Sequence, residues 1–176
     1  MNWFLELVSK NDFWKIILSN VFGFCFALVL FLFSQCMKNI IKKRNYLKSL
    51  KSEIDFNIRL INIYINNFQE WLLLINGGKN GPQEPFDFSQ LQKNFFNRCL
   101  EKGYLYNKFS NEELSNIISM FSYFSIENQQ WINNFSNENY DYEKDPKRSV
   151  ENTFFKHHLS KLERFDTKFE SFKNKL

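Results

Sequence analysis

Histidine and cysteine are the residues with the widest chemical use in this sequence, and their spacing argues against a reactive site. His157 and His158 are the only histidines. Consecutive positions on a helix point about 100° apart, so this pair cannot chelate one metal ion as residues i and i+4 would. A thiol–imidazole pair with Cys99 is a second option. However, Cys99 and His158 both fall on apolar helix faces, which indicates packing. We therefore expect no metal, no cofactor and no catalytic residue.

The acidic residues and the glycine-rich run 77–81 lead to the same expectation. Six acids of the C-terminal half lie at no helical metal-binding spacing, and they are typical of helix caps and a solvated loop: Glu112, Glu113, Glu138, Asp141, Glu143 and Asp145. The run 77–81 lacks the G-x-x-x-x-G-K-[ST] spacing of a phosphate-binding loop and follows a predicted helix, where a strand is required. The sequence therefore favours a non-enzymatic protein with no small-molecule substrate.

A polar pair interrupts the apolar stripe that follows the membrane-like segment. Glu53 and Asn57 are four residues apart, so they share one helix face. They could face a partner helix, form a polar layer that fixes register within a bundle, or lie at a solvated edge. Together with apolar residues of the two stripes, they form our set of partner or register candidates: Glu53, Asn57, Ile61, Phe68, Phe165 and Phe169.

Apolar residues recur at steps of three and four in two long segments, which predicts amphipathic helices. The first stripe follows the basic segment and consists of Leu47, Leu50, Ile54, Asn57, Ile61, Tyr64 or Ile65, Phe68, Leu72 and Ile75. The second lies near the C-terminus and consists of Phe155, His158 or Leu159, Leu162, Phe165, Phe169, Phe172 and Leu176. Both approach a seven-residue repeat and are therefore candidate association surfaces.

Glycine, proline and capping residues divide the rest of the chain into helices. The first stops at the glycine- and proline-rich segment 77–85. A second is expected over 88–102. A third, over 110–136, starts with the capping-box pattern of Ser110 and Glu113. A polar loop over 137–148 precedes the last helix, over 149–175. With no strand-like alternation, the sequence predicts an all-α fold with an antiparallel bundle of about four helices.

Residues 16–37 are long and apolar enough to cross a membrane. These 22 residues carry no charge, and as a helix they reach about 33 Å, which exceeds a hydrocarbon core of about 30 Å. A buried core helix rarely runs so long without a charge. A cleavable signal peptide has an apolar region of about 7–15 residues that ends in small residues. This one is longer and ends in Gln35, Cys36 and Met37, so we expect a retained span.

The positive charge of the chain is concentrated beside this span. Six basic residues follow it before the first acid, Glu53, and five of them are predicted to contact lipid headgroups: Lys38, Lys42, Lys43, Arg44 and Lys48. From Glu53 onward the chain has 15 basic and 17 acidic residues, which argues against nucleic-acid binding. The positive-inside rule places the basic side in the cytoplasm and the N-terminus outside. The predicted organisation is a short segment 1–15, the span 16–37, a basic collar 38–52 and a cytoplasmic helical domain 53–176.

A resemblance to known proteins is carried by residues 46–57. After the basic collar, the pattern Tyr46-Leu47-x-x-Leu50-x-x-Glu53-Ile54-x-x-Asn57 resembles the post-membrane helix of uncharacterised bacterial single-pass membrane-anchored helical proteins. Some proteins of that build are encoded in defence or mobile-element loci. The resemblance implies a membrane-anchored helical architecture, and it carries over no activity, cofactor or catalytic residue.

Two functions fit these features. The first is a membrane-tethered, non-enzymatic interaction module that self-associates or docks a cytoplasmic or membrane protein through its two stripes. The second is an oligomerising effector of a bacterial defence or toxin system, whose spans perturb the membrane. Ser19, Asn20, Gly23 and Ser34 could support helix contacts in that case. Both functions locate the protein in the inner membrane.

Overall fold

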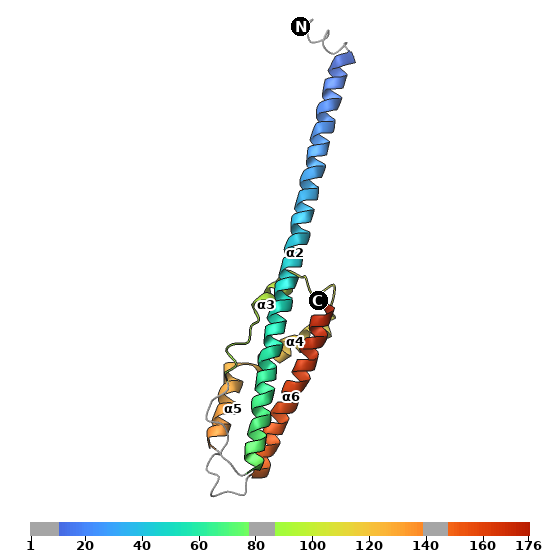
Figure 1. The fold of residues 1–176 in the computed structure, drawn as a ribbon. Coiled ribbons are helices and arrows are strands. Elements are labelled where there is room, and N and C mark those ends of the chain that lie inside the picture. The colour runs from blue at the N-terminus through green and yellow to red at the C-terminus, as the bar shows by residue number, and fades with distance from the viewer. Residues whose placement is uncertain (1–10, 78–86, 139–147) are drawn as a thin grey trace. The chain divides into compact units, whose positions relative to one another are not determined.

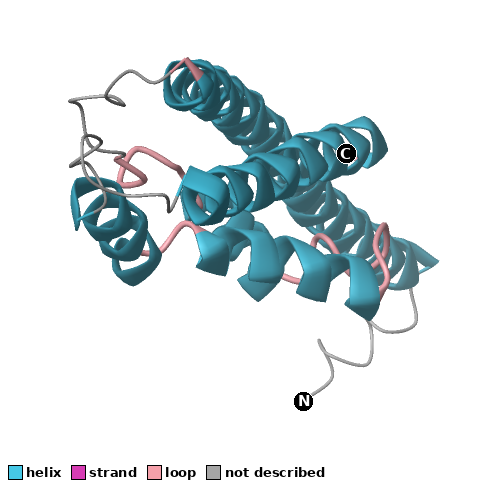
Figure 2. Ribbon diagram, turned by 90° about the horizontal axis from the view of Figure 1, so that it is seen from below, coloured by secondary structure: helices cyan, strands magenta, loops and turns pink. Residues whose placement is uncertain are grey.

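The described part of the chain consists of helices joined by loops (Figure 2). The computed structural model describes residues 11–77, 87–138 and 148–176. The chain divides into an N-terminal unit, Met1–Asn45, and a helical unit, Tyr46–Leu176. The helices are α2 (Asn11–Asn76), α3 (Asn94–Glu101), α4 (Asn111–Tyr123), α5 (Ile126–Glu138) and α6 (Arg148–Lys175). The predicted all-α fold is confirmed for the described residues.

Helix α2 contains both the apolar segment and the first amphipathic stripe, as one helix of 66 residues. It ends where the glycine-rich segment begins, and the N–H of Gly77 donates to the carbonyl of Leu73 over 3.0 Å. Among the described residues, α2 is the one helix long and apolar enough to cross a membrane. Its most apolar window has a mean hydropathy of 2.6 and no buried residue. A membrane anchor and a signal sequence both meet that criterion.

Within the helical unit, α6 runs antiparallel to both α2 and α4. Along α2 the contacting residues are, in chain order, Asp55, Asn62 and Phe68. Their partners on α6 occur in the reverse chain order: Lys173, Asp166 and Phe155. The contacts of α4 with α6 follow the same order, from Glu113–Lys175 to Phe121–Phe169 and Tyr123–Phe165. Figure 1 shows α6, in red, beside the green part of α2. The predicted antiparallel packing is therefore present among these helices.

The two amphipathic stripes form a large part of the core of this unit, together with residues of α3, α4 and α5. The α2 stripe is buried throughout its described length from Leu50 to Leu72, and at Leu50, Ile54, Ile61 and Phe68 no surface remains exposed. The α6 stripe contributes a second row of buried side chains: Phe155, His158, Leu162, Phe169 and Phe172. Burial of α2 side chains begins before residue 53, the predicted start of the helical domain, because the helical unit begins at Tyr46. Residues 46–52 of the predicted collar therefore belong to this unit.

The second predicted helix starts later than expected, because residues 87–93 are held by side chains from other helices. We expected a helix over 88–102, whereas α3 begins at Asn94. The N–H of Phe88 donates to Oε1 of Gln129 over 2.6 Å, and the N–H of Gln92 donates to Oδ1 of Asn57 over 2.9 Å. The hydroxyl of Tyr64 donates to the carbonyl of Asp87. These contacts satisfy backbone groups that a helix would otherwise pair.

The third predicted helix is two helices, and this corrects the single helix expected over 110–136. The chain leaves helical geometry at Phe124 and resumes it at Ile126. Ser125 begins α5 as a cap, since its Oγ accepts from the N–H of Asn128 over 3.2 Å. The Asn128 side chain donates to the free carbonyl of Tyr123 over 2.8 Å. The break also allows the Phe124 ring to pack against Phe88 at a centroid distance of 5.2 Å.

The capping box predicted at the start of α4 is present. The Ser110 hydroxyl accepts from the N–H of Glu113, and the Glu113 carboxylate accepts from the N–H of Ser110 over 2.8 Å. Lys175, in the last turn of α6, forms an ion pair with the same carboxylate. Together with the Ser110 hydrogen bond, this cation lowers the pKa of Glu113 to about 2.

Candidate functional site

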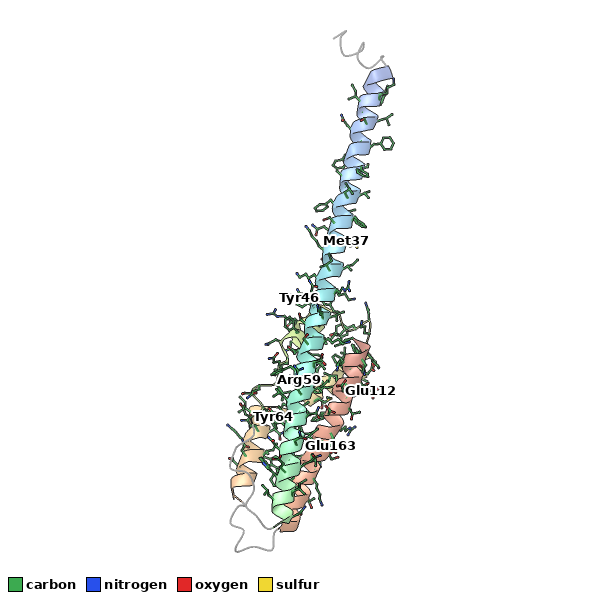
Figure 3. All side chains as sticks on the ribbon, viewed as in Figure 1. Met37, Tyr46, Arg59, Tyr64, Glu112 and Glu163 are labelled. Carbon is green, nitrogen blue, oxygen red and sulfur yellow. The ribbon has the colours of Figure 1, made fainter. Side chains whose placement is uncertain are left out.

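The apolar segment of α2 exposes its side chains around the whole helix. Every residue from Trp14 to Lys42 is exposed, including Phe22, with 71% of its surface accessible. These side chains are drawn along the blue part of α2 in Figure 3. The five predicted headgroup ligands follow. Lys38, Lys42, Arg44 and Lys48 are exposed, and Lys43 is partly buried.

Glu53 and Asn57 form a buried polar layer inside the helical unit. Glu53 exposes 3% of its surface and Asn57 none. The two carboxylate oxygens of Glu53 accept from the N–H groups of Phe95 and Phe96, over 2.8 and 2.9 Å. These N–H groups lie in the first turn of α3, where no intrahelical acceptor exists and a negative charge is favourable. Asn57 exchanges two hydrogen bonds with the backbone of Gln92. The pair therefore fixes residues 92–96 against α2.

The six partner or register candidates contact this chain's own helices. Glu53, Asn57, Ile61, Phe68 and Phe169 are buried. Phe165 is partly buried, and its ring packs against Tyr123 and Phe124 at centroid distances of 5.1 and 5.7 Å. The stripes were expected to serve as association surfaces, and the fold uses them internally, because apolar helix faces bury themselves against the nearest complementary helix. A second chain could reach the five buried side chains only if the bundle opened.

Cys99 and His158 are both buried core residues, as their sequence context indicates, and they lie in different environments. Burial, with a contribution from the Glu53 charge, raises the pKa of Cys99 to about 11. A nucleophilic cysteine needs a lowered pKa, so this thiol is unsuited to that role. His157 is exposed. Within the described residues, no group of three His, Cys, Asp or Glu side chains could hold a metal ion.

His158 lies in an aromatic cage between α2, α4, α5 and α6. Its ring centroid is 4.4 Å from that of Phe154, 5.6 Å from Trp131 and 6.2 Å from Phe68. A hydrogen bond joins the Tyr123 hydroxyl to Nδ1. When the phenol is the donor, the imidazole proton lies on Nε2, which has no hydrogen-bond partner among the described residues.

Burial determines the charge state of this histidine. Desolvation lowers the pKa of His158 to about 4, and the nearby charges of Lys161 and His157 act in the same direction. Burial also raises the pKa of Tyr123 above its ordinary value. Both groups are therefore neutral at pH 7, and the imidazole presents a neutral face to its surroundings.

A groove of about 650 Å³ lies between α4, α5 and α6, and His158 is one of its lining residues. Basic residues of α6 line one side: His157, Lys161, Arg164 and Lys168. The α4 side contributes Asn116, Ser119, Ser122 and Tyr123, and Trp131 of α5 also lines the groove. Sequence reasoning missed this site. The steps of four, three and four between the α6 residues were an available signal, because they place all four on one helix face.

Comparison of the chain with protein-family models, with curated proteins and with solved structures finds no match. The arrangement of its own residues is therefore the basis for a functional hypothesis.

Proposed function

We propose that this protein is a single-pass membrane protein whose span holds a non-enzymatic helical interaction module at the cytoplasmic face of the inner membrane. The fully exposed apolar segment of α2 is the observation that carries the proposal. Monomeric soluble proteins rarely expose a contiguous apolar patch of more than a few hundred Å². A helix that is apolar all around, with its backbone groups paired internally, is suited to a lipid environment.

The basic collar supports the proposed orientation. Lys38, Lys42 and Arg44 are exposed directly after the span, where they would meet anionic headgroups of the inner leaflet. The sequence before the span balances two basic residues, Lys10 and Lys15, with two acidic ones, Glu6 and Asp12. The asymmetry favours a cytoplasmic helical unit.

The interaction role follows from surfaces outside the core. With the two stripes packed internally, large apolar residues remain exposed on the helical unit: Ile63, Leu73, Tyr106, Ile118, Ile126 and Trp131. These residues are candidates for contact with a partner protein or a second copy of the chain.

An oligomerising, membrane-perturbing effector is the alternative. Ser19, Gly23 and Ala27 are exposed at successive steps of four, and a methyl group added at Gly23 would meet nothing within 4 Å. Small residues at this spacing allow close approach of two spans. Asn20 adds a side chain able to form an interhelical hydrogen bond.

Membrane extraction with intact-mass analysis tests the anchor. We expect the protein to stay in the membrane pellet in alkaline carbonate and to retain the mass of the 176-residue chain. Release into the supernatant, or loss of the N-terminal segment, would contradict the proposal. Fusions at the C-terminus test the orientation. We expect green fluorescent protein to fluoresce and alkaline phosphatase to be inactive, and the reverse pattern would place the helical unit outside.

Light scattering of the full-length protein in nanodiscs, with identification of co-purifying proteins, separates the two functions. A stoichiometric partner, or a homo-oligomer that leaves the membrane potential intact, supports the interaction module. A homo-oligomer whose expression collapses the potential supports the effector. A monomer without any partner contradicts both.

A further inference from the structure

Helix α6 separates its charges onto two faces. His157, Lys161, Arg164 and Lys168 lie on the face that lines the groove. The acids Glu163, Asp166 and Glu170 recur at steps of three and four on a different face. That face lies toward α2, since Oδ1 of Asp166 accepts from Asn62 over 3.1 Å. Glu170 also pairs with Lys173, which is bonded to Asp55 of α2. These three acids therefore do not line the groove.

The groove is positive, and no carboxylate of the described residues lines it. The opposing α4 side chains, Asn116, Ser119 and Ser122, carry no charge. Within the described residues, neither Arg164 nor Lys168 takes part in an ion pair. Cations grouped in a concave site attract anions more strongly than scattered surface cations, because the low-dielectric walls focus their field. Arginine and lysine beside hydroxyl and amide donors suit phosphate oxygens.

Aromatic rings lie beside the cations. Trp131 exposes 54% of its surface although its ring contacts Phe154 at 5.0 Å and His158 at 5.6 Å. The Lys161 ammonium lies 5.5 Å from the centroid of Tyr123. An indole that is fixed on one side and open on the other is a stacking platform for a planar ring.

We propose that this groove binds a nucleotide, with its phosphates on Arg164 and Lys168 and its base against Trp131. Trp131 contacts α6 at His158. Arg164 and Lys168 follow His158 by six and ten positions. On a helix that separation is about 9 to 15 Å, enough for a ligand with a base at one end and several phosphates at the other. The groove volume is in the ordinary range for small-molecule sites. This inference goes beyond the membrane role and does not depend on it.

Binding to the full-length protein in phosphatidylcholine nanodiscs tests the assignment. The probes are ATP, inorganic triphosphate and inositol trisphosphate, measured by calorimetry. The groove variant is R164Q/K168Q. Its matched control is R59Q/K156Q, which also removes one arginine and one lysine, both exposed and outside the groove. We expect ATP and triphosphate to bind the control normally and the groove variant at least about tenfold more weakly, because charge-assisted contacts are lost.

Two substitutions of Trp131 test the base contact. Trp131→Ala should weaken ATP about tenfold through loss of stacking, and change triphosphate binding less than about twofold. Trp131→Phe retains a ring and should restore most of the ATP affinity. Thermal melts of each variant establish that the helical unit is folded.

Three outcomes would overturn the proposal. The first is failure of ATP to bind. The second is equal ATP affinity of the groove variant and its control. The third is binding of inositol trisphosphate in preference to ATP with no effect of Trp131→Ala, which would identify a lipid headgroup site.

Discussion

Phenylalanine occurs in both units of this chain, and its side chains have opposite environments in the two. Phe22 and Phe24, in the apolar part of α2, expose 71% and 69% of their surface. Phe68 and Phe169, in the helical unit, expose none. All four lie on helices. The difference lies in their neighbours: Phe68 recurs with other apolar residues at steps of three and four, whereas Phe22 belongs to a run that is apolar on every side.

This contrast shows that apolar content alone does not predict burial within a protein. A stripe covers one side of a helix and can be buried by one or two partner helices. A continuous apolar run would need partners around its whole circumference, or a solvent that is itself apolar. Lipid would supply such a solvent for the N-terminal unit, as proposed above. The four C-terminal helices cover the apolar stripe of the second half of α2.

The largest effect should come from truncating one phenylalanine of each kind. Phe68→Ala removes a fully buried ring and should lower the free energy of unfolding of the helical unit by about 3–5 kcal/mol. Phe26→Ala, in the span, should leave that free energy within about 0.5 kcal/mol of the wild type. Denaturant titration in mild detergent measures both. Equal losses would show that the span is also packed within the protein.

Adding an acid to the span sharpens the comparison from the opposite direction. Phe26→Asp places a charge near the middle of residues 16–37 and should cost about 3 kcal/mol of membrane insertion. The variant should shift toward the soluble or degraded fraction, measured by carbonate extraction. Phe26→Leu is the control and should remain in the membrane. Full insertion of the aspartate variant would mean that this segment does not face lipid.

Removing an acid from the helical unit should also be costly. Glu53→Ala leaves the N–H groups of Phe95 and Phe96 without their acceptors, and two hydrogen bonds to a charged group are worth about 3 kcal/mol. Glu70→Ala, at an exposed position of the same helix, should change stability by less than about 0.5 kcal/mol. Thermal unfolding compares them. A similar melting temperature for both variants would argue against a capping role for Glu53.

The smallest effect concerns pH. The pKa of His158 is about 4 in the fold, against an ordinary value of 6.5. At pH values between these two, His158 is therefore protonated in the unfolded chain and neutral in the folded chain. Stability should fall by about 2 kcal/mol as the pH drops from 8 to 5. His158→Gln should reduce that slope, whereas His157→Gln, at an exposed position, should keep it. Denaturation midpoints at several pH values measure the slopes.

Local patterns predicted much of the fold. The α2 stripe, its stop at Gly77 and the capping box at Ser110 depend on residues close in sequence, and all three are present. The errors lie where distant side chains decide the backbone. Residues 87–93 avoid a helix because Asn57 and Gln129 bond to them, at sequence separations of 35 and 41. No local pattern contains that information.

The candidate sites were predictable to different degrees. Glu53 and Asn57 were identified because a polar pair is unexpected beside an apolar stripe, although their acceptor and donor roles toward residues 92–96 required the structure. The groove was missed because its walls come from three helices. Asn116 and Ser119 carry no signal of their own, and the break at Phe124, which separates α4 from α5, was not predicted.

The capping of α3 by Glu53 has a consequence for the order in which this short helix exchanges its amide hydrogens with deuterium. First-turn amides of a helix are ordinarily open to solvent and exchange fast. Here the amides of Phe95 and Phe96 are bonded to a buried carboxylate. We expect these two amides to be among the slowest in α3. This eight-residue helix should then open from its C-terminal end, at Glu101, while its N-terminal turn remains closed until α2 itself separates.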